Sequence, residues 1–586
     1  MKRIIVVLLL LAPALFAQTS TAPTADVQAL KDALAAQQQQ IQRLSQQLQQ
    51  VQQNGQQAQT AAAASQAQAT QPQSVAVASL RTSSADNTAP VAQEMPQAAE
   101  EAPPTANSEL EGPLTIRFKG ISITPGGFAA AEFVRRSRAL GADVTTPFNS
   151  LTLPGASQSK ESEFFGSARQ SRPTIYILTH LKNAELSSYL SADFLSAGVT
   201  STATQTNSYT LRLRQVWGQA KFNNGWSFLG GQMWSLVTEN KLGIRPSDDA
   251  GKTNDARPST IDAGYNVGFS FARQYGIRVT KDFGDKVWFA VAMENPEATL
   301  TTHGNADNFL LGEVGDGKSY NSGANYSFNP SPDIIAKIAV DPGFGHYEVF
   351  GLFDRFADRV FPCVDVSAKT LCGGSPTAGP SALGAYNSSK NGGGFGANAR
   401  WNFDHKHVVL GLHGFGGNGV GRYGAGQLSD LAINADGSLA LIRGYQGLGT
   451  LEWHGAKLDL YLYGGAEYAS RTAQIDPVTK KPVGYGSTLF NNSGCYLENA
   501  PGANTGFTPG ALANCTGDTR ALIEGTGGFW YRFYNGPRGR FQFGTQYSYV
   551  TRNTWAGNGG LTPGASGLAP HGIDGMVLTS FRYYLP

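Results

Sequence analysis

Several arginines lie in segments whose residues alternate between apolar and polar. Arg212 and Arg214 stand two residues apart, so they share one face of a predicted strand. Arg278, Arg443 and Arg540 occupy predicted inward or rim positions on three other strands. A charged side chain facing lipid costs about 2–4 kcal/mol at mid-membrane, so we expect strand arginines to face a wet lumen. There they would lower the barrier for anions and could bind carboxylates or phosphates; the alternative is wall charge that only keeps the lumen wet.

A second concentration of charge lies in residues 239–263, the third of the long connectors in this chain. Arg245, Asp248, Asp249 and Arg257 are its candidate constriction residues. Carboxylates and guanidinium groups that face each other across a narrow passage would create a transverse field, which selects polar solutes. An ordinary solvated loop is the alternative. A calcium site at Asp248 and Asp249 would need an ordered ligand spacing that this cluster lacks.

Other chemistry-bearing patterns are weak. His405 and His407 have no third metal ligand in the sequence, and the glycines of residues 392–396 are not followed by the Lys-Ser/Thr of a phosphate loop. No paired carboxylates or nucleophile with a base stand out. Lys and Arg number 45 against 43 Asp and Glu, so net charge predicts no nucleic-acid partner. We therefore expect neither an enzyme nor a cofactor or metal.

The elements that must position these residues form a regular series. Short and long connectors alternate between strand-like segments, and strands of about 9–11 residues suffice to cross a bilayer. The sequence predicts an all-β fold, a 16-stranded antiparallel transmembrane β-barrel over residues 113–586, with 114–124 as an additional strand or a lead-in. A soluble sandwich is the alternative. The predicted strands are 126–137, 172–182, 184–196, 208–222, 225–238, 264–281, 285–294, 332–341, 344–356, 392–403, 405–416, 440–454, 456–470, 519–534, 539–552 and 572–585.

The predicted strands alternate at period two. In 264–281, Val267, Phe269 and Tyr275 oppose Gln274 and Arg278, which predicts an apolar face toward lipid and a polar face toward the lumen. Tryptophans close to the short turns predict a periplasmic aromatic girdle, because tryptophan prefers the headgroup layer. These are Trp226, Trp288, Trp401 and Trp453.

The N-terminal part predicts export and association. Residues 1–17 have the charged start and short apolar stretch of a signal peptide. Residues 26–53 carry an a/d heptad seam, which predicts an α-helical coiled coil that pairs between chains as a dimer or trimer; a glutamine-rich disordered tail is the alternative. Residues 54–112 predict a disordered linker rich in Ala, Gln and Pro. The seam residues are Val27, Leu30, Leu34, Ile41, Leu44, Leu48 and Val51.

Four cysteines fall in two long connectors. Local pairing on an exported chain predicts the disulfides Cys363–Cys372 and Cys495–Cys515. A zinc site would require all four to converge, and nothing in the sequence places the two connectors together.

Three stretches resemble the DcaP-like trimeric outer-membrane porins: residues 211–218 (LRLRQVWG), 230–235 (GGQMWS) and 273–278 (RQYGIR). Phosphate-selective porins share a similar layout. The resemblance implies homotrimeric barrels in a Gram-negative outer membrane, a coiled coil in the periplasm, and passive diffusion of small anionic, dicarboxylate-like solutes. In many general porins the third loop folds inward. A barrel-borne enzyme or an adhesin is the alternative of a different class.

Overall fold

The computed structural model describes residues 114–195, 209–247, 254–301, 303, 309–311, 329–362, 385–477, 480–500, 512–558 and 566–586. The predicted signal peptide, coiled coil and linker lie outside the described residues, as do Asp248, Asp249, Cys363 and Cys372. Within the described part, no helix has the length and apolarity that a membrane crossing requires.

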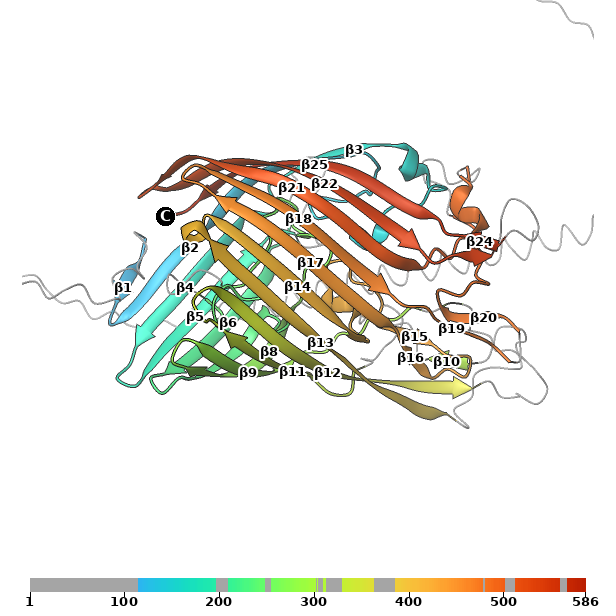
Figure 1. Ribbon diagram of the computed structural model, residues 1–586, viewed down its shortest axis with the longest axis horizontal. Helices are drawn as coiled ribbons and strands as arrows, with labels where there is room; N and C mark the ends of the chain where they lie inside the picture. Colours follow the sequence, from blue (N-terminus) through green and yellow to red (C-terminus); the bar gives the residue numbers. More distant parts are fainter. Residues whose placement is uncertain are drawn as a thin grey trace, which may run out of the picture. The chain divides into compact units, whose positions relative to one another are not determined.

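The described residues form one closed antiparallel barrel of sixteen long strands (Figure 1). Each strand pairs with its neighbours in the sheet, and the last strand pairs with β2 from Phe128↔Tyr584 to Arg136↔Met576, which closes the cylinder. Closure leaves no row of unpaired backbone groups along the wall. The barrel predicted from the sequence is therefore confirmed.

The barrel strands match the sixteen predicted segments in order. They are β2 (Ile121–Arg136), β4 (Arg172–His180), β5 (Ala184–Asp193), β6 (Arg212–Phe222), β7 (Trp226–Trp234), β8 (Arg273–Phe283), β9 (Val287–Glu294), β11 (Asp333–Val340), β12 (Gly345–Pro362), β13 (Tyr386–Phe403), β14 (Val408–Asn418), β17 (Arg443–His454), β18 (Leu458–Ala469), β21 (Thr519–Gly536), β22 (Gly539–Thr554) and β25 (His571–Tyr584).

Short elements decorate the barrel ends. Strand β1 (Ile116–Phe118) pairs with the start of β2, so the segment before the barrel supplies an additional short strand. The remaining short strands are β3 (Glu163–Ser167), β10 (Phe309–Leu311), β15 (Leu431–Ile433), β16 (Leu439–Leu441), β19 (Thr472–Ile475), β20 (Pro482–Tyr485), β23 (Gly557–Asn558) and β24 (Ser566–Leu568). The 3₁₀ helices are η2 (Phe148–Ser150), η3 (Ser157–Lys160), η4 (Asp404–Lys406), η5 (Gly421–Tyr423) and η6 (Ser493–Tyr496).

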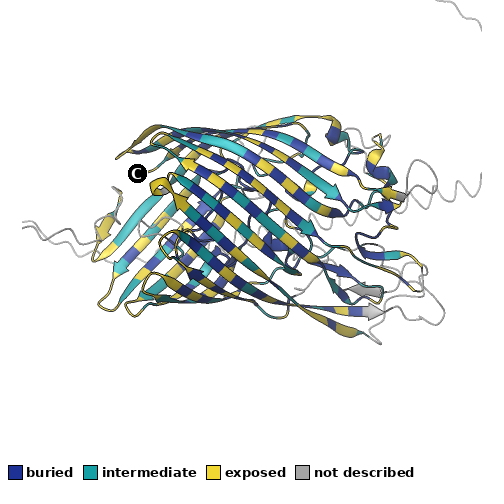
Figure 2. Ribbon diagram, in the orientation of Figure 1, coloured by how far each residue is buried: buried dark blue, intermediate teal, exposed yellow. Residues whose placement is uncertain are grey.

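Burial alternates along the strands, and Figure 2 shows buried and exposed residues in turn across much of the wall. In β11, Ile335 and Lys337 face inward and are buried, whereas Ile334 and Ile338 face outward and are exposed. An exposed apolar outer face with a polar inner face is the pattern that the sequence analysis predicted for a transmembrane barrel.

One predicted strand starts too early. The segment 264–272 belongs to the connector before β8, and Val267 and Phe269 are buried inside the barrel instead of facing outward. The backbone turns at Gly268, whose φ of +86° favours glycine, and a Cβ there would lie 2.0 Å from the carbonyl oxygen of Gly447. Apolar residues alternate in segment 264–272 because they pack against the inner wall of the barrel. A strand that faces lipid would show the same alternation.

The tryptophan girdle is present only in part. Trp226 and Trp453 lie near the short turns and are 42% and 40% exposed. Trp288 instead faces inward and is 1% exposed, because the third connector packs on it: the guanidinium of Arg245 lies 5.9 Å from its ring centre. Its closeness to a short turn correctly predicted the end of the barrel at which Trp288 lies. The prediction that Trp288 belongs to the outward girdle was wrong, because its side chain faces inward.

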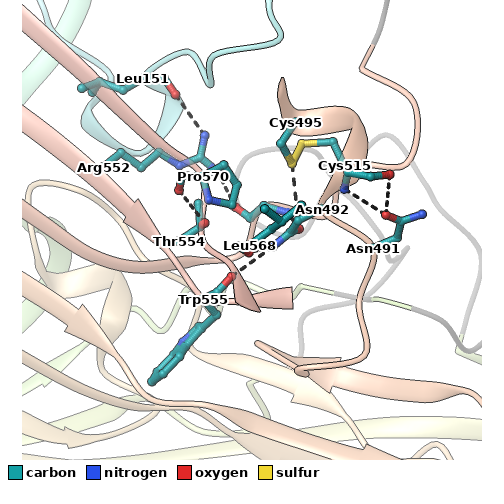
Figure 3. Close-up of a disulfide and its surroundings, with 12 residues drawn as sticks. Leu151, Asn491, Asn492, Cys495, Cys515, Arg552, Thr554, Trp555, Leu568 and Pro570 are labelled. Atoms are coloured by element: carbon teal, nitrogen blue, oxygen red, sulfur yellow. Dashed lines mark hydrogen bonds between the residues drawn. A yellow bond between two sulfur atoms is a disulfide. The ribbon is translucent and has the colours of Figure 1, made fainter. Parts of the chain in front are cut away.

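The long connectors are tied to one another at the end opposite the short turns. The predicted disulfide Cys495–Cys515 is present (Figure 3). Next to it, Asn492 Nδ2 donates to the carbonyl oxygens of Trp555 and Leu568, each at 3.1 Å. The carbonyl of Cys495 accepts from the N–H of Gly155, in the connector between β2 and β4, at 2.7 Å. Three connectors are therefore joined around the disulfide.

Candidate functional site

The third long connector, residues 235–272, runs inside the barrel; we refer to it as loop 3. It starts after β7 and first approaches the short-turn end, where Gly243 N donates to Asp341 Oδ2 at 2.9 Å and Arg245 pairs with Asp285. Asn240 forms an antiparallel bridge to Asp255, so residues 235–240 and 255–272 meet there side by side. The predicted charged loop therefore occupies the lumen.

Inward-facing side chains of the wall hold the backbone of loop 3. An irregular segment inside a barrel needs partners for its N–H groups, and carboxylate and amide oxygens provide them. On the return path, Ile261 N donates to Gln546 Oε1 at 2.6 Å, and Val267 N to Glu524 Oε2 at 2.8 Å. Gly268 N donates to Glu467 Oε1 at 2.8 Å. These contacts fix loop 3 against β18, β21 and β22.

A cavity of about 370 Å³ lies between loop 3 and the wall formed by β2, β4, β21, β22 and β25. Five cationic side chains line it, against three carboxylates, so the lining is basic. The cationic residues are Arg172, Lys241, Arg257, Arg540 and Arg582, and the carboxylates are Asp255, Asp262 and Asp459. Such a lining attracts small anions and disfavours cations.

Aromatic rings support the arginines of this cavity. The guanidinium of Arg540 lies 4.1 Å from the ring centre of Tyr584, and that of Arg582 lies 4.7 Å from the ring of Trp530. Guanidinium groups stack favourably on aromatic faces, which orients them without consuming their in-plane donors. Arg540 keeps its buried Nε for a further acceptor, whereas Arg582 already donates to Glu132 and Gln170.

Carboxylates neutralise some of these arginines and leave two without an ion pair. Arg257 pairs with Asp255, and Arg582 pairs with Glu132 at 2.7 Å. Arg172 and Arg540 have no carboxylate partner within the described part of the chain, and the buried Nε of each lacks a hydrogen-bond acceptor there. A buried N–H donor without an acceptor lowers the stability of the folded state. An anion that passes through the cavity could accept hydrogen bonds from both Arg172 and Arg540.

Loop 3 residues report the positive potential. Burial alone would raise the pKa of the Tyr265 phenol, but the guanidinium groups of Arg257 and Arg214 lower it to about 7. Burial lowers the pKa of Lys241. Only the shift of Tyr265 reports nearby positive charge, which favours an anion, because the shift of Lys241 comes from loss of solvent.

Carboxylates on the opposite part of the wall lie among cationic partners. Buried carboxylates of β9, β11 and β12 face the lumen on strands that lie about half a turn of the sheet away from the cavity: Glu294, Asp333, Glu348, Asp354 and Asp358. Loop 3 contacts both regions. Lys337 pairs with Glu348 and Arg422 with Asp333 on that side, so the described residues do not separate positive from negative charge across the lumen, and the transverse field stays a prediction.

The residues singled out from the sequence lie in different places. Arg212 and Arg214 both face inward and converge on Asp193, at 2.9 and 2.5 Å. Arg278 is buried inside the wall and donates to the carbonyl oxygen of Trp234 at 2.9 Å. Arg540 and Arg257 line the cavity.

Two further arginines lie away from the cavity. Arg245 is at the short-turn rim, where it pairs with Asp285. Arg443 is on the outward face of β17, beside the exposed Tyr445, and of the inward and rim positions that the sequence left open it occupies a rim. It is the first residue of its strand, near the barrel end, where the cost of an outward charge falls to about 0–1 kcal/mol.

Sequence reasoning missed Arg172, Arg582 and Asp193. Arg582 had a usable signal, since it shares its strand face with Ser580 and Asp574, which are polar. The sequence signal for Asp193 was weaker, because Asp193 lies opposite Arg212 only once β5 pairs with β6.

Known structures share the fold. No protein-family model and no curated protein matches the sequence. The outer membrane channel DcaP of Acinetobacter baumannii superposes with a TM-score of 0.51 at 15% identity, covering 80% of this chain and 99% of that one. OmpT, an outer membrane protein of Vibrio cholerae, gives 0.39 at 10% identity, with 80% and 99% covered. An anion-selective porin from Comamonas acidovorans gives 0.38 at 10%, with 79% and 100% covered. At these identities the likeness to DcaP extends to the fold alone.

Proposed function

We propose that the protein is a passive outer-membrane channel for small hydrophilic anions, dicarboxylate-like in size and charge. Arg172 and Arg540 carry the proposal, because they face a common cavity without an ion pair. Two guanidinium groups suit a solute with two anionic ends better than a neutral one. The fold shared with a known outer membrane channel supports the location in the outer membrane. Two alternatives have the same mechanism. A channel selective for phosphate would be narrower in its choice of solute, and a general porin with a weak preference for anions would be broader.

Ion selectivity tests the proposal. We expect the purified protein to give discrete conductance steps in planar bilayers, with a reversal potential in a salt gradient that indicates anion preference. In the double variant Arg172→Gln and Arg540→Gln, the anion-to-cation permeability ratio should fall roughly thirtyfold, because the two lost charge-assisted contacts together are worth about 2 kcal/mol.

Arg443→Gln is the matched control, because Arg443 lies on the outward face. Its reversal potential should equal that of the unmodified protein. Cation preference in the unmodified protein, or an unchanged ratio in the double variant, would contradict the anion site. Absence of discrete steps would contradict the channel itself.

We also propose that the chain assembles as a homotrimer, through barrel walls and the heptad seam of residues 26–53. That seam has no predicted partner within its own chain, and the linker would let it associate with other copies. Deletion of residues 26–53 should lower the fraction of trimer in light scattering of detergent-solubilised protein at low concentration. An unchanged trimer fraction would remove the seam from assembly.

A further inference from the structure

One tyrosine of loop 3 has its hydroxyl among arginine side chains. Tyr265 is 7% exposed and lines the cavity between loop 3 and the wall. Its phenol oxygen accepts a hydrogen bond from Arg214 Nη2 at 3.4 Å and another from the guanidinium of Arg257. No described residue accepts a hydrogen bond from the phenol in return. The phenol proton therefore has an acceptor only in the water or solute that fills the cavity.

The backbone holds this side chain in a conformation that bulky residues rarely adopt. Tyr265 has a φ of +66°, and its N–H donates to the carbonyl oxygen of Asp262 at 3.1 Å. The carboxylate of Asp262 accepts from Gly264 N at 2.7 Å and from Thr146 N at 3.1 Å, which ties the turn to the connector between β2 and β4. Strain of this kind persists where the surrounding structure imposes it, and it is concentrated at functional residues.

Four guanidinium groups surround the phenol. They belong to Arg172 of β4, Arg214 of β6, Arg257 of loop 3 and Arg273 of β8. Burial alone would raise the pKa of Tyr265, but these groups lower it to about 7, because each of them stabilises a phenolate. An ordinary tyrosine ionises near pH 10, whereas Tyr265 can lose its proton near neutral pH.

Two carboxylates share these arginines without contacting the phenol. Asp193 of β5 pairs with Arg212 and Arg214, and Asp255 of loop 3 pairs with Arg257. Within the described residues, neither carboxylate forms a hydrogen bond with the phenol, so its oxygen meets guanidinium groups alone. The other described titratable groups of this region are Tyr189 of β5 and Lys241 of loop 3.

We propose that Tyr265 is an internal counter-ion of the anion site and thereby sets its selectivity. As a phenol it leaves the guanidinium groups to a passing anion, and as a phenolate it pairs with them, so that an anion must displace it. The only chemical step is the transfer of one proton from the hydroxyl to water in the cavity. Anion preference should therefore fall as pH rises through neutrality. This inference rests on the proposed anion channel and names the residue that regulates it.

The pH dependence of ion selectivity tests the proposal. In planar bilayers with a gradient of potassium chloride, the anion-to-cation permeability ratio of the unmodified full chain should fall about fivefold between about pH 5.5 and pH 8.5, because the phenolate replaces one charge-assisted contact of the solute. Tyr265→Phe keeps the ring but cannot ionise, so its ratio should change less than about twofold over this range. Tyr275→Phe is the matched control and should behave like the unmodified protein, because Tyr275 is 62% exposed on the outward face of β8.

Arg214→Gln distinguishes a titration from a structural effect. It removes a guanidinium group that donates to the phenol, so the midpoint of the pH dependence should move upward by about one pH unit. Asp193 keeps Arg212 as its partner in this variant. An unchanged midpoint would overturn the proposal. So would a constant ratio in the unmodified protein, or a pH dependence that persists in Tyr265→Phe.

Ultraviolet absorbance separates this proposal from the proposed channel. Over the same pH range, the unmodified protein should gain the absorbance of one phenolate among its 22 tyrosines, and Tyr265→Phe should not. A gain without any conduction would contradict only the channel, whereas an anion preference equal at both pH values would contradict only the role of Tyr265. If Tyr265→Phe does not fold, absence of the phenolate signal in the unmodified protein overturns the proposal, and a shift of that signal to higher pH in Arg214→Gln supports it.

Discussion

Excising residues 241–254 of loop 3 should raise single-channel conductance about two- to threefold, because residues 241–247 lie inside the lumen. These residues lead from the bridge between Asn240 and Asp255 to the short-turn rim. Since the bridge holds those two residues side by side, an Asn-Gly pair can join them as a two-residue hairpin. The rest of loop 3, from Asp255 to Ala272, keeps its contacts with the wall.

The same change should also weaken solute discrimination. It removes Lys241 from the cavity and separates Arg245 from Asp285, so part of the charge lining the passage is lost. Large neutral sugars should then enter liposomes faster relative to small anions. The measurements are single-channel recording and a liposome-swelling series with sugars of increasing size.

A matched control shortens a hairpin outside the lumen. Strands β19 and β20 pair from Thr472↔Tyr485 to Ile475↔Pro482, so their connection can also be replaced by Asn-Gly. Conductance should not change in this variant. If excision of 241–254 leaves conductance and sugar entry as they were, loop 3 does not limit flow, and the constriction hypothesis for Arg245 and Arg257 fails.

The barrel was predictable because its pattern is local. Tight turns, strand length and period-two alternation are each visible in a dozen residues, and all sixteen strands follow from them. The inward position of Arg540 follows in the same way, from polar neighbours at even spacing in β22. For Arg443 the sequence left an inward and a rim position open, since the penalty for an outward arginine depends on depth in the membrane, which the sequence does not give.

Loop 3 shows the complementary limit. Its charge was visible in the sequence, but its partners come from strands hundreds of residues away, such as Gln546 for Ile261 and Glu524 for Val267. An apolar residue buried against an inner wall looks the same in sequence as one facing lipid, and this is why Phe269 was placed on the wrong face. Arg172 was missed for another reason: its importance lies in having no ion pair, and pairing is known only from the fold.

Lys337→Met should lower the free energy of unfolding by about 3 kcal/mol, the scale of breaking a buried ion pair. Lys337 is inaccessible to solvent, and its Nζ donates to Glu348 Oε2 and to the carbonyl oxygen of Thr238, both at 2.8 Å. Glu348 Oε1 also accepts from Asn240 N of loop 3 at 3.1 Å. Methionine would fill the space but leave the carboxylate without its lysine.

The pair therefore joins the wall to loop 3 as well as β11 to β12. Urea unfolding in lipid vesicles, followed by tryptophan fluorescence, measures the change, and Lys286→Met at an exposed turn is the control that should stay within about 0.5 kcal/mol. The double variant Lys337→Met and Glu348→Gln should recover to within about 1–2 kcal/mol of the unmodified protein, since a neutral amide can still accept from Asn240 N without being a buried unpaired charge. Two results would contradict this explanation: Lys337→Met behaves like the control, or the double variant is less stable than the single one. The loss of stability would then not come from an uncompensated Glu348. His346, whose Nε2 lies 3.0 Å from Glu348 Oε1, would suffice as its cationic partner.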